Sequence, residues 1–303
     1  MKIVIAGGTG FIGGALVDKL LTSGHEIIVL TRNKRLVRLS SIKKLKFVYW
    51  DAATLSSWSK YLEGADAVMN LAGEPLAEKR WTSGHKQIIM KSRVESTRIL
   101  VRAIREARSR PATLISLSAV GYYGDVPEGE IDENHRPGDS FLADVCIKWE
   151  AEAHKADNLG IRTVILRGGL VLEREGGVLG KMLSTFRLHA GGIPGSGRQW
   201  VPWIHREDMI GIIEFALQSN NLAGPVNAMA PKPVTMKEFV ETLVKVIKKP
   251  IRATVPDIIV RTALGEMADM ILTGQKAVPR RLLDEGYQFK YTDLRKALEA
   301  IFN

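Results

Sequence analysis

Residues 2–13, KIVIAGGTGFIG, decide the fold, because an apolar strand passes directly into a turn with glycine at every third position. Glycines in that place permit a tight turn, let the backbone approach a pyrophosphate and allow the next helix to pack closely on the strand. The apolar spacing of GGALVDKLLTSG predicts that helix, whose free N–H groups would face the phosphates. We predict a dinucleotide-binding turn, the alternative being a glycine turn without a ligand. The residues expected to contact the dinucleotide are Gly7, Thr9, Gly10, Phe11, Ile12 and Gly13.

Strand-like and helical segments alternate through the first two thirds of the chain. The apolar runs are KIVIAG, HEIIVLT, LKFVYW, DAVMNLAG, TLISLSAV and RTVILRGG, and helical spacings such as STRILVRAIREARS lie between them. This alternation predicts an α/β fold in which helices cover both faces of a parallel sheet, joined by right-handed crossovers. The expected architecture is therefore a doubly wound Rossmann domain.

The rhythm of the sequence changes after about residue 172. The glycine-rich loops EREGGVLG and AGGIPGSGRQW are followed by a helical segment, REDMIGIIEFALQS, a short strand, GPVNAMA, and a further helix, TMKEFVETLVKVIKK. We predict that residues 1–172 and 207–229 form the NADP-binding Rossmann domain. Residues 173–206 and 230–303 are expected to form a smaller C-terminal substrate domain.

Composition and charge restrict the classes of protein that remain. The chain of 303 residues has one cysteine and a formal net charge of +10. It shows no apolar run long enough to span a bilayer, no secretory signal and no cysteine–histidine cluster with metal-ligand spacing. We expect a cytoplasmic protein without a metal site, without a membrane partner and with a small-molecule substrate.

Seven basic residues and no acid lie between positions 32 and 46, directly after the second predicted strand. The remaining positive charge is spread thinly and no nucleic-acid-binding motif is present, so a local phosphate site fits this cluster better than a nucleic-acid groove. A solvated basic loop is the alternative.

The end of that second strand predicts which dinucleotide is preferred. An NAD site usually offers an acidic side chain to the ribose 2′-hydroxyl, whereas this chain offers Thr31, Arg32 and Asn33. The expected cofactor is therefore NADP(H). A charged hydrogen bond to the 2′-phosphate contributes about 1.5–3 kcal/mol, which favours NADPH over NADH by roughly ten- to a hundredfold.

Further motifs extend the pattern to nearly the whole chain. They are NLAGEPLAEKRWT, SAVGYYG, FLADVCIKWE, GGIPGSGRQWVPWIH and GEMADMILTGQKAVP. On these motifs the chain resembles the extended short-chain dehydrogenase/reductases and, within them, the YfcH-type epimerase-like family. The resemblance implies a Rossmann core, NADP(H), cofactor contacts at Ala72 and Gly73, and nucleotide-sugar epimerase or dehydratase ancestry. It also implies, by analogy, a homodimer, but it brings no known substrate.

In active members of that superfamily a serine, a tyrosine and a lysine four residues after the tyrosine do the chemistry. Lys148 falls where the resemblance puts the lysine, which binds the nicotinamide ribose. Ser118 falls near the serine, with Ser116 as the alternative, and the tyrosine position is Asp144. A solvated aspartate has no proton to donate near neutral pH unless burial raises its pKa by several units. A surface ladder of Asp144, Lys148 and Glu152 at i, i+4 spacing is the competing interpretation.

Other residues could supply the missing acid–base group or contact the substrate. Tyr122 or Tyr123 could supply a phenol, and Tyr122 is the favoured candidate. The segment GGIPGSGRQWVPWIH passes over the substrate cleft in relatives, so we predict substrate contacts there. The alternative is that the same side chains join the two domains. A histidine in such a segment is more often packed in the interior than catalytic. The residues expected to contact the substrate are Arg198, Trp200, Trp203 and His205.

These observations predict an NADP(H)-dependent oxidoreductase of the epimerase/dehydratase type, which transfers hydride at a carbinol or carbonyl carbon of a small metabolite. A different class remains open because the tyrosine is missing. In that alternative the protein binds NADPH without turnover and contacts a protein partner as a regulator or redox sensor. A nucleic-acid binder, the third class, would show a steep salt dependence.

Overall fold

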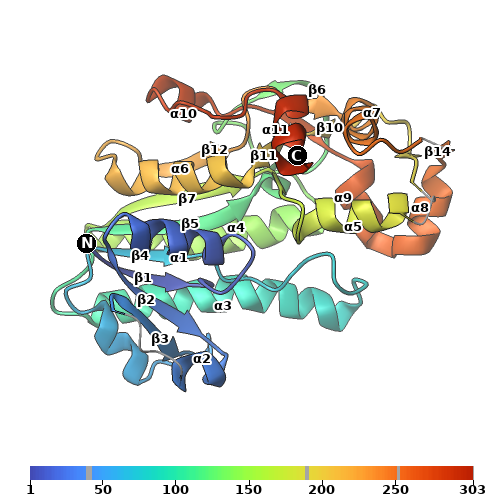
Figure 1. Ribbon diagram of the computed structural model, residues 1–303. Helices are drawn as coiled ribbons and strands as arrows, with labels where there is room; N and C mark the ends of the chain where they lie inside the picture. Colours follow the sequence, from blue (N-terminus) through green and yellow to red (C-terminus); the bar gives the residue numbers. More distant parts are fainter. Residues whose placement is uncertain (39–42, 188–190, 251–252, 303) are drawn as a thin grey trace.

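The computed structural model describes residues 1–38, 43–187, 191–250 and 253–302. Seven strands form one central sheet (Figure 1), and each pairs with its neighbours in parallel. In sheet order they are β12 (Gly224–Ala228), β7 (Arg162–Gly168), β5 (Thr113–Ala119), β4 (Ala67–Asn70), β1 (Lys2–Ala6), β2 (Glu26–Thr31) and β3 (Leu45–Tyr49). The predicted strand runs and the doubly wound Rossmann fold are confirmed.

Helices cover both faces of this sheet, as the alternation predicts. In Figure 1, α1 (Gly13–Thr22) and α6 (Arg206–Gln218) lie on one face and α3 (Ser83–Glu106) on the other. Each face has its own buried core, with Leu16 and Ile212 on the first and Leu100 and Ile104 on the second. Helix α4 (Phe141–His154) packs on α3 and on β5, and the short α2 (Lys34–Arg38) follows β2.

The order of the strands fixes where a ligand can bind. The chain winds from β1 to β3 in one direction and from β4 to β12 in the other, so the direction reverses between β1 and β4. In open parallel sheets the ligand crevice lies at the carboxyl ends of the strands at such a reversal. The loops after β1 and β4 therefore border the candidate site.

A third core holds the glycine-rich segments and the C-terminal helices together. It combines residues of the 170–205 region with residues after 230, including Trp203, Phe239 and Leu298. Its elements are β8 (Leu170–Leu172), α5 (Gly177–Arg187), β9 (Ile193–Pro194), β10 (Trp200–Val201), β11 (Trp203–His205), β13 (Val234–Thr235), α7 (Met236–Val246), α9 (Asp269–Leu272) and α11 (Leu294–Phe302). Strand β14 (Thr254–Val255) pairs with β9, and α8 (Asp257–Leu264) follows it in the chain. These elements come from two pieces of the chain, one before and one after α6 and β12.

One part of the C-terminal region departs from the predicted division. Strand β15 (Gln275–Ala277) pairs with β6 (Val126–Ile131), and α10 (Arg280–Asp284) packs on β12. Leu282 of α10 is fully buried in the core beneath α1 and α6. The predicted boundary assigned all of 230–303 to the second domain, whereas β15 and α10 contact β6 and β12 of the Rossmann domain, with Leu282 buried in its core.

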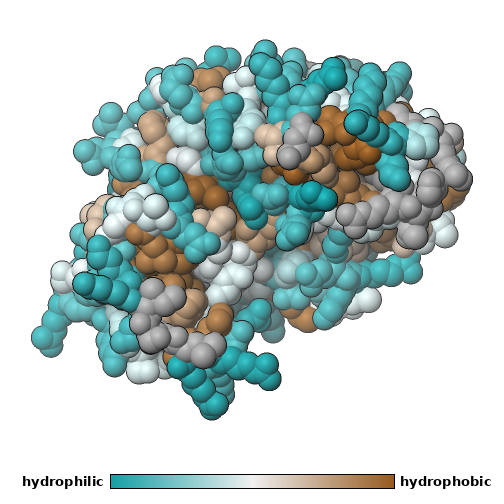
Figure 2. Space-filling view, in the orientation of Figure 1, coloured by the Kyte–Doolittle hydropathy of each residue, from teal (hydrophilic) through white to brown (hydrophobic). Residues whose placement is uncertain are grey.

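Hydrophilic side chains cover most of the face seen in Figure 2, and hydrophobic ones gather beside α1 and between α7 and α11. Within the described ranges, no helix combines the length and the apolar character needed to cross a membrane.

Candidate functional site

The glycine turn after β1 is held closed by contacts that exclude side chains. Gly7 has a φ of +81°, and a Cβ built on it would lie 2.6 Å from the Leu71 carbonyl group in the loop after β4. A Cβ on Gly13 would lie 2.2 Å from the Gly7 carbonyl oxygen. The Gly10 N–H donates to that same oxygen at 3.0 Å. Among the described residues no side chain caps α1, so the N–H groups at the beginning of this helix are free to bind phosphate oxygens.

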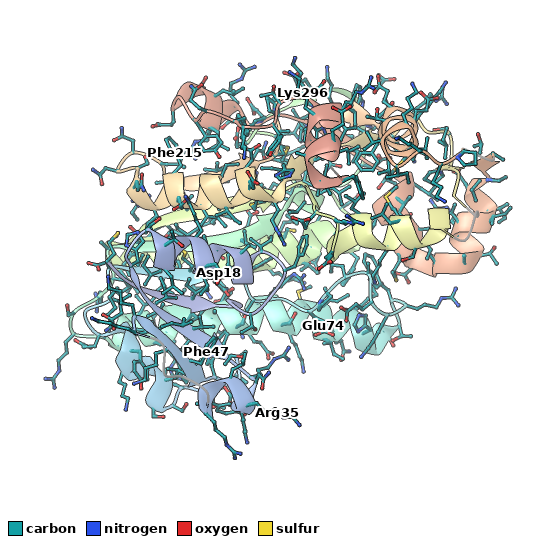
Figure 3. The ribbon with its side chains drawn as sticks, viewed as in Figure 1. Asp18, Arg35, Phe47, Glu74, Phe215 and Lys296 are labelled. Carbon is teal, nitrogen blue, oxygen red and sulfur yellow. The ribbon has the colours of Figure 1, made fainter. Side chains whose placement is uncertain are left out.

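The end of β2 presents exposed basic side chains beside this turn. Thr31 is buried, and its hydroxyl accepts from the Asn33 N–H at 3.1 Å, while the Asn33 side-chain oxygen accepts from the Arg35 N–H at 3.0 Å and so starts α2. Arg32 is exposed and forms no ion pair within the described part of the chain. Figure 3 shows Arg35 on α2, at the outer end of the sheet. Part of the predicted basic cluster, positions 39–42, lies outside the described residues.

A network from α3 fixes the loop after β4. The buried Asn70 side chain donates to the Thr97 hydroxyl at 2.7 Å and accepts from the Ala72 N–H at 3.2 Å. The Arg93 guanidinium donates to the Glu74 carbonyl oxygen at 3.0 Å. Figure 3 shows Glu74 beside α3, beyond the carboxyl end of the sheet. The predicted cofactor residues Ala72 and Gly73 therefore lie next to the glycine turn, on a loop tied to α3.

Asp144 and Lys148 form an ion pair on α4, with 2.7 Å between Nζ and Oδ2. Their side chains are 48% and 55% exposed. The burial that would turn Asp144 into a proton donor is therefore absent. The predicted ladder does not continue, because Glu152 pairs instead with Arg98 at 2.9 Å and with Lys155 at 2.7 Å.

Ser118, at the end of β5, is buried and its hydroxyl donates to Glu150 Oε1 at 2.6 Å. Glu150 also accepts two hydrogen bonds from Arg167, at 3.0 and 2.8 Å, in a fully buried pair. Burial alone would lower the pKa of Arg167. The hydrogen bonds and the negative charge of Glu150 outweigh burial and raise the pKa of Arg167. The structure therefore turns the Ser118 hydroxyl inward to this pair. Ser116, the alternative, is also buried.

The two neighbouring tyrosines both lie near Arg167 but differ in exposure. The Tyr122 ring lies 3.5 Å from the Arg167 Cζ, measured to the ring centroid, and Tyr122 is partly exposed. Tyr123 is buried; its hydroxyl donates to Asn227 at 2.7 Å and accepts from Arg167 at 3.0 Å, and burial raises its pKa to about 12. Tyr123 is thus a core residue, and Tyr122 is the phenol that remains available.

The buried pair of Glu150 and Arg167 was not predicted from sequence. Arg167 ends the otherwise apolar run TVILR of β7, and Glu150 lies on the buried side of α4. An isolated charge at the end of a buried strand was the signal that could have found it, because such a charge requires a partner.

The predicted substrate residues divide into two groups. Trp203 is fully buried and its indole N–H donates to the Lys232 carbonyl oxygen at 3.0 Å. His205 is 4% exposed; its Nδ1 accepts from the Glu207 N–H and caps α6, and burial lowers its pKa. Trp203 thus lies buried in the third core and His205 lies buried at the start of α6, and their contact with a substrate stays a prediction.

Arg198 and Trp200 remain candidates. Arg198 is exposed, and Trp200 is partly exposed on β10, where the Lys276 ammonium lies 5.3 Å from the centroid of its ring.

The glycine-rich segment before α5 contacts the dinucleotide turn directly. A Cβ on Gly176 would lie 2.8 Å from the Phe11 ring, and one on Gly177 would lie 3.2 Å from it. Arg206 lies 5.6 Å from the centroid of the same ring and forms an ion pair with Glu173 at 2.7 Å. Phe11 therefore joins the glycine turn to the second unit, a contact that the sequence pattern did not indicate.

Among the residues that the structure describes, no group of three or more histidine, cysteine, aspartate or glutamate side chains could hold a metal ion. Cys146 is buried, and burial raises its pKa to about 11. It is therefore not an activated nucleophile.

The parallel sheet, its reversal between β1 and β4 and the closed glycine turn define a dinucleotide-binding Rossmann protein. Residues 3–228 match the model of the NAD dependent epimerase/dehydratase family, and the chain belongs to that family. Residues 255–301 match a domain of unknown function, DUF1731. The narrower YfcH-type assignment stays a resemblance.

The relatives cover the whole chain. It is 40% identical over 304 residues to the chloroplastic SDR39U1 homologue of Arabidopsis thaliana, an epimerase family protein. This match covers 99% of this chain and 86% of that protein. It is 38% identical over 302 residues to the epimerase family protein YfhF of Bacillus subtilis, covering 99% and 98%.

Solved structures show the same likeness. The human epimerase family protein SDR39U1 (isoform 2), crystallised with NADPH, superposes with a TM-score of 0.86 at 35% identity and covers 99% of both chains. A nucleoside-diphosphate sugar epimerase from Corynebacterium glutamicum superposes with a TM-score of 0.79 at 30% identity; the match covers 100% of this chain and 58% of that one.

Proposed function

We propose that this protein binds NADP(H) and acts as an oxidoreductase of the epimerase/dehydratase type on a small metabolite, with nucleotide-linked sugars as the leading substrate class. The observation that carries the proposal is the closed glycine turn beside the end of β2, where Thr31 is followed by Arg32 and Asn33 and no acid is present. The NADPH in the human relative supports the choice of cofactor. The sugar epimerase from Corynebacterium glutamicum supports the substrate class.

The residues present fit this cofactor. Gly7, Gly10 and Gly13 would hold the pyrophosphate, and Arg32 would hold the 2′-phosphate. Lys148 would bind the nicotinamide ribose after leaving Asp144. That exchange is cheap, because an exposed i, i+4 ion pair contributes only about 0.3–0.5 kcal/mol.

The substrate chemistry needs a proton donor other than Asp144. Bound NADPH supplies the hydride to a carbonyl carbon. Tyr122 would donate the proton that the carbonyl oxygen takes up, and would accept it in the reverse direction. The buried pair of Arg167 and Glu150 positions both Tyr122 and Ser118, since the guanidinium lies against the Tyr122 ring and the carboxylate holds the Ser118 hydroxyl.

Binding titrations with NADPH and NADH, followed by nicotinamide fluorescence, test the cofactor half of the proposal. We expect NADPH to bind roughly ten- to a hundredfold more tightly than NADH, and Arg32→Ala to remove most of that difference. Lys148→Ala should weaken both nucleotides. Arg102→Ala is the matched control, because Arg102 is exposed on α3 and, within the described part of the chain, its ion pair is with Glu106. Equal affinities for the two nucleotides in the unaltered protein would contradict the proposal.

The catalytic half is tested by Tyr122→Phe. This change removes the phenolic proton and keeps the ring against Arg167, so we expect turnover to be lost while NADPH affinity is unchanged. Candidate nucleotide sugars would be screened by the absorbance of the nicotinamide. Full activity in the Tyr122→Phe protein would assign the proton transfer to another group.

A further inference from the structure

Arg93, in the middle of α3, lies between two parts of the candidate site. On one side its Cζ is 5.3 Å from the centroid of the Trp149 ring on α4. On the other side a Cβ built on Gly73 would lie only 3.1 Å from Cζ and Nη2. A side chain at position 73 would press on the guanidinium, so the glycine is what lets the exposed loop after β4 lie directly against this cation.

Among the described residues, the Arg93 guanidinium forms no ion pair. No carboxylate lies within ion-pair distance of it among the described residues, and its hydrogen bonds go to the neutral oxygens of Ile89 at 3.2 Å, Ser92 at 3.4 Å and Glu74 at 3.0 Å. Its Nε–H donates no hydrogen bond within the same residues. The Arg93 side chain is partly buried; this burial lowers its pKa, and electrostatic interactions with Cys146 and Glu74 oppose the shift. Buried charges in proteins are normally paired, because desolvation of an unpaired charge is costly.

The other arginines near this site show the usual arrangement. Arg167 is buried beside Glu150, and Arg98, one turn and a half further along α3, pairs with Glu152. The hydrogen bond from Arg93 to the Glu74 carbonyl oxygen does not require a charged donor. A neutral side-chain amide could donate the same bond without the cost of desolvating a charge. A structural role for Arg93 therefore leaves its charge unexplained.

The position of Arg93 relates that charge to the site. Gly73 directly follows Leu71 and Ala72, which contact Gly7 of the dinucleotide turn. Trp149 follows Lys148, and the Cys146 thiol near Arg93 contacts the Ala119 carbonyl oxygen at the end of β5 at 3.7 Å. The guanidinium thus lies at the carboxyl ends of β4 and β5, where a Rossmann crevice receives its ligands.

We propose that Arg93 is an anion-binding residue of this site, which holds a carboxylate or phosphate oxygen of a bound molecule. The inference rests on the proposed function in one respect, namely that the crevice is the binding site. It deepens that function by naming the ligand chemistry: either a phosphate of the cofactor is held at this point, or the substrate itself is anionic. A guanidinium is suited to both, because it offers charge together with directed N–H donors.

The test compares Arg93→Gln, which keeps donors but removes the charge, with Arg93→Lys, which keeps the charge. Arg102→Gln on the same helix is the control. NADPH affinity is measured by fluorescence, and the affinities of inorganic phosphate and malonate are measured by calorimetry on the NADPH-loaded protein. We expect Arg93→Gln to lose about ten- to a hundredfold in one of these affinities, and Arg93→Lys to lose less.

The two sources of the anion are separated by which affinity falls. A loss of NADPH affinity identifies a cofactor phosphate, whereas unchanged NADPH affinity with lost phosphate or malonate binding identifies an anionic substrate. Folded Arg93→Gln protein that binds all three probes like the unaltered protein would overturn the proposal.

If Arg93→Gln does not fold, Gly73→Ala and Arg93→Lys decide the question, because the added methyl group presses on the guanidinium and should weaken the same affinity. Unaltered affinities in both would again overturn the inference. Equal binding of NADH and NADPH by the unaltered protein would defeat only the proposed function, since probe binding that depends on Arg93 would still be measured.

Discussion

Gly13 and Gly14 are neighbours at the start of α1, yet a methyl group would meet very different surroundings at each. A Cβ at Gly13 would lie 2.2 Å from the Gly7 carbonyl oxygen and 2.8 Å from the Gly8 Cα, while nothing lies within 4 Å of one at Gly14. We expect Gly13→Ala to destabilise the protein by about 1–3 kcal/mol and to weaken NADPH binding, because the turn must open. Gly14→Ala should stabilise it by about 0.5–1 kcal/mol.

Denaturant unfolding and NADPH titration of the two variants check this pair. Equal effects of the two substitutions would mean that the close packing of α1 on the turn is not what holds the pyrophosphate site.

At the same scale, sequence spacing predicts local contacts better than it predicts burial. The pairing of Asp144 with Lys148 follows from i, i+4 geometry and is present. The enclosure of Trp203 could not be predicted in this way, because it depends on α7 and α11, which lie far along the chain and close over the ring. For the same reason a role for Arg93 in the site was not predicted, since the absence of an ion pair at this residue depends on residues that are distant in the sequence.

At the scale of elements, α6 depends on a histidine cap. His205 Nδ1 accepts from the Glu207 N–H at 3.1 Å, and burial lowers the pKa of His205. Because the unfolded chain takes up the proton first, the stability from this group is fully present above the unfolded pKa of about 6.5 and is lost as the pH falls through the lower folded pKa. Asparagine also caps helices well. When the pH falls, the free energy of unfolding should therefore decrease less in the His205→Asn protein than in the unaltered protein.

Urea unfolding at about pH 7.5 and about pH 5.5 measures that loss, which we expect to be smaller by roughly 1 kcal/mol in the variant. His25, whose pKa burial also lowers, is present in both proteins and its contribution cancels. The same pH dependence in both proteins would show that His205 does not titrate in this range.

The elements of the sheet were predictable because buried parallel strands are continuous apolar runs bounded by glycine and polar residues. The pairing of β15 with β6 could not be predicted. Strands of a few residues carry little sequence pattern, and these two strands lie about 145 positions apart in the chain.

At the scale of the whole molecule, the C-terminal segment belongs to both units. Leu282 of α10 is fully buried in the core of the Rossmann domain, whereas the next residue, Leu283, is 42% exposed. We expect Leu282→Ala to cost about 2–5 kcal/mol and Leu283→Ala to stay within about 0.5 kcal/mol. Thermal and urea unfolding compare the two. Similar small effects would mean that α10 is only loosely attached to β12.

The stacking of Trp149 on Arg93 also has an optical consequence. Excited indoles pass energy to a reduced nicotinamide with an efficiency that falls steeply with distance, and this indole lies at the carboxyl ends of β4 and β5. The protein therefore carries its own reporters: as NADPH fills the crevice, ultraviolet emission from its six tryptophans, Trp149 among them, should dim while blue emission from the nicotinamide brightens, so that occupancy can be followed in real time without a label.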